Sequence, residues 1–71
     1  MTLEVLRIER FQERVQGMVR MTPEALAETV ANRRWRLRRM REARMPRSFI
    51  ERQGDLVIIA AAALYCQQRN G

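Results

Sequence analysis

Arginine is concentrated between residues 33 and 47, where it occupies eight of fifteen positions and is opposed by a single acid, Glu42. This window carries a charge of +7, which exceeds the +6 of the whole chain. Guanidinium groups at this density repel one another unless an anion neutralises them, and a nucleic-acid backbone supplies anions together with the free energy of counterion release. We therefore expect the window to bind an anionic partner. We call its arginines the arginine cluster: Arg33, Arg34, Arg36, Arg38, Arg39, Arg41, Arg44 and Arg47.

Catalytic chemistry is not expected from this composition. The chain has no histidine, which removes the usual general base and the usual partner of a Ser or Cys nucleophile. Most carboxylates stand at helical spacing from arginines, a pattern typical of solvated ion pairs. Cys66 is the one cysteine, and with carboxylates alone it makes a poor zinc ligand set. We expect a non-enzymatic protein that uses no metal, no cofactor and no small-molecule substrate.

The residues before the cluster have the periodicity of an amphipathic helix over about 3–20. Four apolar side chains follow a 3-4-3 spacing, while charged side chains fall largely on the other side. This apolar stripe consists of Ile8, Phe11, Val15 and Met18.

A second helix, over about 23–44, is predicted to carry most of the arginine cluster. Thr22-Pro23-Glu24 is a strong start signal, because Thr caps free backbone N–H groups, Pro is tolerated at the first helical position, and Glu favours the positive helix end. Pro46 pushes the residue before it away from helical dihedral angles and so ends the helix. A helical-wheel projection distributes the arginines around the whole cylinder, which is typical of a helix that stands clear of the core or is wrapped by a partner.

The last segment, over about 47–69, is predicted to be an apolar helix that is buried on most of its sides. Gly54-Asp55 could end a short turn and start a new helix, or the helix could continue through it. We favour continuation, because a coiled-coil-like spacing of apolar residues is maintained across the glycine. That spacing comprises Phe49, Leu56, Ile59, Ala63 and Cys66.

A chain of 71 residues forms one domain, here residues 1–71, and buries only about 60% of the surface that its unfolded form exposes. It has no disulfide or zinc site to stabilise it, so self-association is the remaining way to enlarge its core. We expect an all-α, three-helix protein with a helical hairpin, assembled as a dimer or a higher oligomer. The residues expected at the interface are Ile8, Phe11, Val15, Met18, Phe49, Leu56, Ile59 and Ala63.

A membrane location is not expected. The N-terminus shows no basic start followed by an apolar run, so it does not read as a signal peptide. The longest apolar stretch, Leu56 to Cys66, has eleven residues, about half of what a membrane span requires. We expect a cytoplasmic protein.

The run from Asn32 through Arg33-Arg34-Trp35 to Arg44 resembles the arginine-rich helical motifs of phage antiterminators and lentiviral RNA-export regulators. In those families a single arginine-dense helix enters a widened RNA groove. The resemblance implies that Asn32 reads a base edge and Trp35 stacks on a base, while the arginines contact phosphates. Leu37 and Met40 interrupt the arginines here and indicate that one side of the helix packs on protein. Trp35 has an alternative role as a packing residue in the core or at an interface.

A second resemblance indicates a protein partner. Leu37-x-x-Met40, then Pro46-x-x-Phe49, then an Ala-rich helix that ends near residue 68, looks like the small hairpin co-chaperones that hold needle subunits of bacterial type III secretion systems. It implies binding through the apolar third helix. Two functions therefore stand side by side: nucleic-acid binding, to RNA or DNA, and a protein-binding module. The latter would be such a co-chaperone or a small, possibly phage, regulator that docks on an acidic protein surface.

Overall fold

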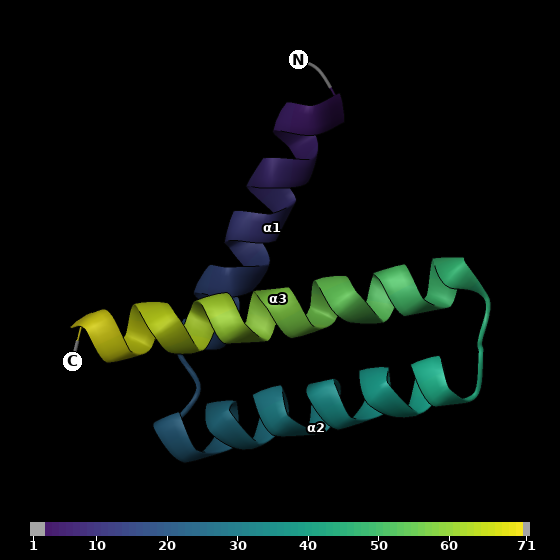
Figure 1. The fold of residues 1–71 in the computed structure, drawn as a ribbon. Coiled ribbons are helices and arrows are strands. Elements are labelled where there is room, and N and C mark those ends of the chain that lie inside the picture. The colour runs from purple at the N-terminus through teal and green to yellow at the C-terminus, as the bar shows by residue number, and fades with distance from the viewer. Residues whose placement is uncertain (1–2, 71) are drawn as a thin grey trace.

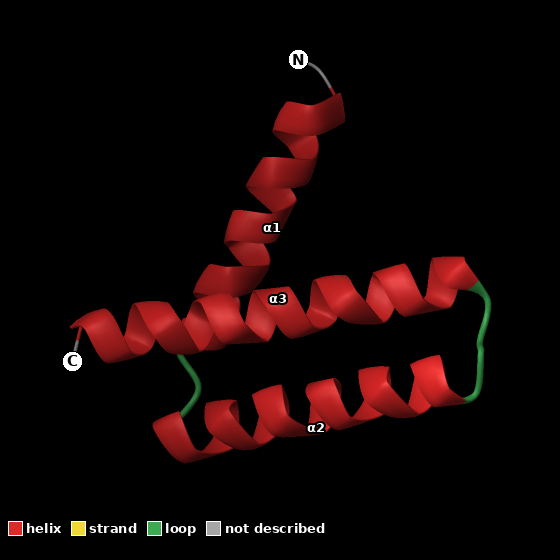
Figure 2. Cartoon of the chain, in the orientation of Figure 1, coloured by secondary structure: helices red, strands yellow, loops and turns green. Residues whose placement is uncertain are grey.

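Three helices make up the computed structural model, which describes the backbone of residues 3–70 and the side chains of residues 7–69. They are α1 (Leu3–Val19), α2 (Pro23–Glu42) and α3 (Arg47–Asn70), and this stretch contains no strand (Figures 1 and 2). The prediction of an all-helical protein with three helices is confirmed, and the helix ends lie within two residues of those expected. Assembly into an oligomer stays a prediction.

α3 is the central element of the fold. It pairs with α2 as an antiparallel hairpin and also packs against α1, which crosses α3 steeply (Figure 1). The molecule is flat, with principal extents of 38 × 37 × 14 Å. Because α1 contacts the hairpin near its own C-terminal end, its N-terminal half extends away from the other helices.

The start of α2 has the predicted cap. The hydroxyl Oγ1 of Thr22 accepts a hydrogen bond from the backbone N–H of Ala25 at 3.2 Å, and Pro23 is the first helical residue. The N–H of Leu26 then closes the first helical turn on the carbonyl of Thr22 at 2.9 Å. These contacts satisfy orphan donors at the helix start and turn the chain from α1 into α2.

α3 runs without interruption through Gly54-Asp55, as the spacing of its apolar residues predicted. A helix can continue through glycine at a cost of about 1 kcal/mol relative to alanine, and here the packing of α3 against both other helices offsets that cost. None of the described helices combines the length and the apolar character that crossing a membrane requires.

The core is small and lies where the three helices meet. Among the described side chains, four buried apolar residues form the central cluster there, and Leu26 is the largest of the fully enclosed ones. Alanines at the centre of α3 let the neighbouring helices approach closely. The buried apolar residues are Val15, Leu26, Val30, Ile59, Ala60 and Ala63.

Gln67, near the end of α3, ties down the turn between α1 and α2. Its amide Nε2 donates to the carbonyl of Val19 at 3.1 Å and to the carbonyl of Met21 at 2.6 Å. Both carbonyls belong to the end of α1 and its turn, where helical partners are missing. One side chain thus fixes the position of α1 on the hairpin.

Candidate nucleic-acid interface

The arginine cluster covers the second half of α2, the following turn and the first residue of α3. Arg33 is partly buried, and the other seven cluster residues are exposed. α2 packs substantially only against α3, so most of its circumference is open to solvent (Figure 1). This arrangement displays guanidinium groups around a single helix, as the wheel projection predicted.

Acidic side chains neutralise little of this charge. Arg39 pairs with Glu42 at 3.5 Å and Arg47 pairs with Glu51 at 2.9 Å, and both pairs are solvent-exposed. No other ion pair forms between the side chains that the structure describes. Exposed pairs of this kind are weak and are screened by salt, so the field of the cluster remains strongly positive. The cluster members without a described acidic partner are Arg33, Arg34, Arg36, Arg38, Arg41 and Arg44.

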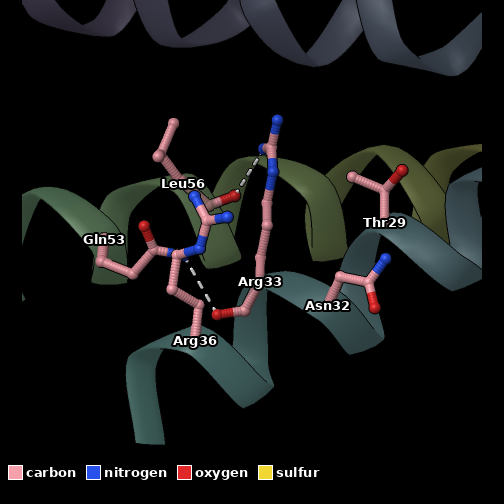
Figure 3. A pocket seen from close by; sticks show the side chains of 6 residues that line it. All are labelled: Thr29, Asn32, Arg33, Arg36, Gln53 and Leu56. Atoms are coloured by element: carbon pink, nitrogen blue, oxygen red, sulfur yellow. Dashed lines mark hydrogen bonds between the residues drawn. The ribbon is translucent and has the colours of Figure 1, made fainter. Parts of the chain in front are cut away.

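Arg33, which was predicted to bind a partner, also has a structural role within the chain. Its Nη1 donates a 2.8 Å hydrogen bond to the carbonyl of Leu56 and lies 3.6 Å from the sulfur of Met18. In return, the amide Nε2 of Gln53 donates to the carbonyl of Arg33 at 3.1 Å (Figure 3). Arg33 therefore connects all three helices. Its part in binding a partner stays a prediction.

A hollow of about 320 Å³ opens beside Arg33, between α2 and α3. We call it the α2–α3 hollow. Its lining is mixed in polarity: two guanidinium groups, two side-chain amides, one hydroxyl and one aliphatic side chain. Arg36 reaches into it from α2 (Figure 3). The lining residues are Thr29, Asn32, Arg33, Arg36, Gln53 and Leu56.

Trp35 lies on the solvent side of α2 and is 62% exposed. The guanidinium carbon of Arg39 lies 5.8 Å from the centre of its ring, within range of a cation–π interaction. Within the chain, Trp35 is therefore not a core residue, and its ring is available for stacking. Asn32, one turn earlier, is also exposed.

The end of α2 has a left-handed residue that the sequence did not indicate. Arg44 has φ of 53°, and the backbone N–H groups of Arg44 and Met45 donate to the carbonyls of Arg41 and Met40, each at 3.1 Å. This is the hydrogen-bond pattern of a Schellman motif, whose left-handed position is usually glycine. It ends the helix at Glu42 and turns the chain toward Pro46.

The residues predicted to form a self-association interface fall into three groups by burial. Val15, Ile59 and Ala63 are buried in the core of the single chain, because α1 packs on α3 through them. The single chain already encloses these side chains, and their part in an interface between chains stays a prediction. Met18 and Leu56 are partly buried at the same junction. The predicted interface residues that remain exposed are Ile8, Phe11 and Phe49.

Sequence reasoning missed Gln53 and Gln67, the two polar side chains that fasten α3 to the rest of the chain. Their signal was present: Gln53, Leu56, Ala60, Ala63 and Gln67 follow the 3-4 spacing of a helix seam. A polar residue at such a position faces neighbouring helices and must find a partner there.

Comparisons of the chain with protein-family models, with curated proteins and with solved structures find no match.

Proposed function

We propose that this protein binds nucleic acid, without catalysis, through the exposed part of the arginine cluster. The observation that supports the proposal is the set of guanidinium groups on α2 and its C-terminal turn that are exposed and have no acidic partner among the described side chains. These residues are Arg34, Arg36, Arg38, Arg41 and Arg44.

A polyphosphate partner suits this surface better than a single carboxylate. From Arg33 to Glu42, α2 rises by about 15 Å at 1.5 Å per residue, so the exposed guanidinium groups are spread over several phosphate positions of a nucleic-acid strand. Each can donate two parallel hydrogen bonds to phosphate oxygens. Such contacts hold the backbone with little readout of sequence. The exposed ring of Trp35 adds a stacking surface that any base can use.

The test is the salt dependence of binding. With about five phosphate contacts, the slope of log K against log salt should be roughly −3.5 for single strands and −4.5 for duplex DNA. Replacing Arg34, Arg38 and Arg41 by Gln should remove about three contacts and flatten the slope accordingly. Glutamine keeps the side-chain length and the helix propensity nearly unchanged. Fluorescence anisotropy with labelled RNA and DNA oligonucleotides measures both quantities.

A matched control removes the same charge elsewhere. Replacing Arg7, Arg10 and Arg69 by Gln changes three exposed arginines that lie outside the cluster, so the slope should change little. If both triple variants weaken binding equally, net charge alone is responsible and α2 has no special role. Absence of binding to RNA and DNA at low salt would refute the proposal.

Trp35 gives an independent readout. Because it is 62% exposed, its emission should be red-shifted and accessible to iodide or acrylamide in the free protein. Stacking on a base should quench it when single-stranded RNA or DNA is added. An unchanged Trp signal at saturating nucleic acid would show that no base stacks on Trp35.

A protein-binding function is the second candidate, and exposed apolar side chains favour it. Ile8 on the projecting half of α1, and Ile58 and Tyr65 on α3, are each more than half exposed. A partner helix or groove could cover such residues. Binding of this kind depends on apolar anchors and should survive moderate salt, whereas binding through the arginine cluster should not.

A further inference from the structure

A second hollow, of about 400 Å³, lies between α1 and α3 on the side of Arg33 that faces Met18. We call it the α1–α3 hollow. Three of its six lining residues carry aliphatic or thioether side chains, and Gly17 contributes no side chain. The lining residues are Arg14, Gly17, Met18, Arg33, Leu56 and Ile59.

Two guanidinium groups flank this apolar surface. Neither Arg14 nor Arg33 forms an ion pair with a described acidic side chain. Both hydrogen bonds that Arg33 donates start at Nη1. The other N–H groups of its guanidinium are therefore not used in these bonds. A flat apolar group with an anion attached complements this combination, because guanidinium planes stack on aromatic rings and attract negative charge.

The two hollows lie side by side and share part of their lining. Arg33 and Leu56 line both of them, and the α2–α3 hollow continues from Arg33 to Arg36 along the arginine cluster. A strand whose phosphates follow α2 can therefore place a neighbouring group in the α1–α3 hollow. In a duplex the bases are stacked inside the helix, whereas in a single strand they can turn outward.

We propose that the α1–α3 hollow holds one unstacked base of a single-stranded nucleic acid, between the guanidinium groups of Arg14 and Arg33, while the adjoining phosphates contact the α2 arginines. This inference rests on the proposed function and adds a base-binding subsite to it. The volume of about 400 Å³ is within the range of small-ligand sites.

The first experiment compares a ten-residue oligothymidylate with an abasic oligonucleotide of the same length. Both carry the same phosphates, so contacts to the backbone alone would give equal affinities. The base-binding subsite predicts that the oligothymidylate binds about tenfold more tightly, which is near the lower part of the range for stacking one base. Equal affinities would overturn the subsite and leave the proposed function standing. Absence of binding to either oligonucleotide would overturn both.

The second experiment fills the hollow. A Cβ added at Gly17 meets no atom within 4 Å, and Gly17 is exposed, so Gly17→Leu should fold and should raise the melting temperature by improving helix propensity. We expect this variant to lose the part of the preference for the oligothymidylate that the hollow contributes, and Gly17→Leu combined with Trp35→Ala should bind the two oligonucleotides equally. Its slope of log K against log salt should stay that of the unmodified protein, because the phosphate contacts are untouched.

Three controls separate the hollow from other causes. Gln16→Leu adds the same side chain at the neighbouring exposed position, and Gly54→Ala improves helix propensity at a site that is also open; both should keep the preference for the oligothymidylate. Trp35→Ala removes the other stacking surface and should also keep it. If the preference disappears in Trp35→Ala and persists in Gly17→Leu, the base stacks on Trp35 and the hollow is not the subsite.

Discussion

The guanidinium group of Arg33 donates a 2.8 Å hydrogen bond to the backbone carbonyl of Leu56. The carbonyl lies within α3, so the bond crosses from one arm of the hairpin to the other. It divides the arginine cluster into one residue that holds the helices together and seven that the fold leaves exposed. Because of that division, substitutions of neighbouring arginines should change the free energy of unfolding by different amounts.

Replacing Arg33 by Ala should lower the free energy of unfolding by about 1–3 kcal/mol, because a hydrogen bond from a charged donor and the packing of its aliphatic stem are lost together. Arg34→Ala, at the next and exposed position, should change stability by no more than about 0.5 kcal/mol. Urea unfolding followed by circular dichroism measures both variants. Equal effects would mean that the Arg33–Leu56 bond contributes nothing to stability.

Arg44→Gly should stabilise the protein by about 1 kcal/mol, since a left-handed backbone is costly for arginine and nearly free for glycine. In a domain of this size the melting temperature should rise by about 4–8 °C. Ala43 has right-handed φ and ψ of −78° and −2°, so the control Ala43→Gly should gain nothing. A lower melting temperature for Arg44→Gly would contradict the Schellman geometry.

Gln67→Ala should cost about 1–3 kcal/mol, because two carbonyls at the end of α1 lose their side-chain donor. The loss should be local at first. Hydrogen exchange should speed up in α1 and in the turn around Met21 more than in the α2–α3 hairpin. Gln68→Ala is the control, since Gln68 is exposed. Uniform loss of protection over all three helices would show that α1 does not open separately.

Self-association should appear as a dimer or larger species in sedimentation at micromolar concentration, because the projecting half of α1 leaves Ile8 57% exposed and Phe11 36% exposed. Phe11→Arg should dissociate this species and leave the chain folded. Ile59 is only 4% exposed, so Ile59→Arg should unfold the chain outright by burying an unpaired charge. A folded monomer before any substitution would remove the oligomer prediction.

The sequence allowed the helices and their starts to be predicted well, because these depend on local rules. Thr22 and Pro23 act through the next few residues of the backbone, and the continuation of α3 through Gly54 follows from spacing alone. The crossing of α1 over α3 is a tertiary relationship, and no local pattern contains it.

The sequence did not indicate which of the predicted interface residues the single chain would bury, and this has a physical reason. An apolar stripe predicts only that a partner covers it. Val15 and Ile59 belong to one buried cluster within the chain. The same sequence pattern would also fit burial against a second copy of the chain. The contact of Arg33 with α3 was not predicted for a related reason: its residue type indicated an exposed charge, while its place in the seam of Leu26, Val30, Leu37 and Met40 indicated contact with α3.

The central place of α3 affects the order in which this protein can take shape as it is synthesised. α1 and α2 precede α3 in the chain, and neither has another substantial packing partner among the described residues. At about 5–20 residues per second, the 24 residues of α3 take roughly 1–5 s to be made. During that interval the arginine-rich half of α2 already exists without its hairpin partner. A nearby anionic chain, including the ribosome's own RNA, could contact the arginines before α3 is made and Arg33 can bond to Leu56.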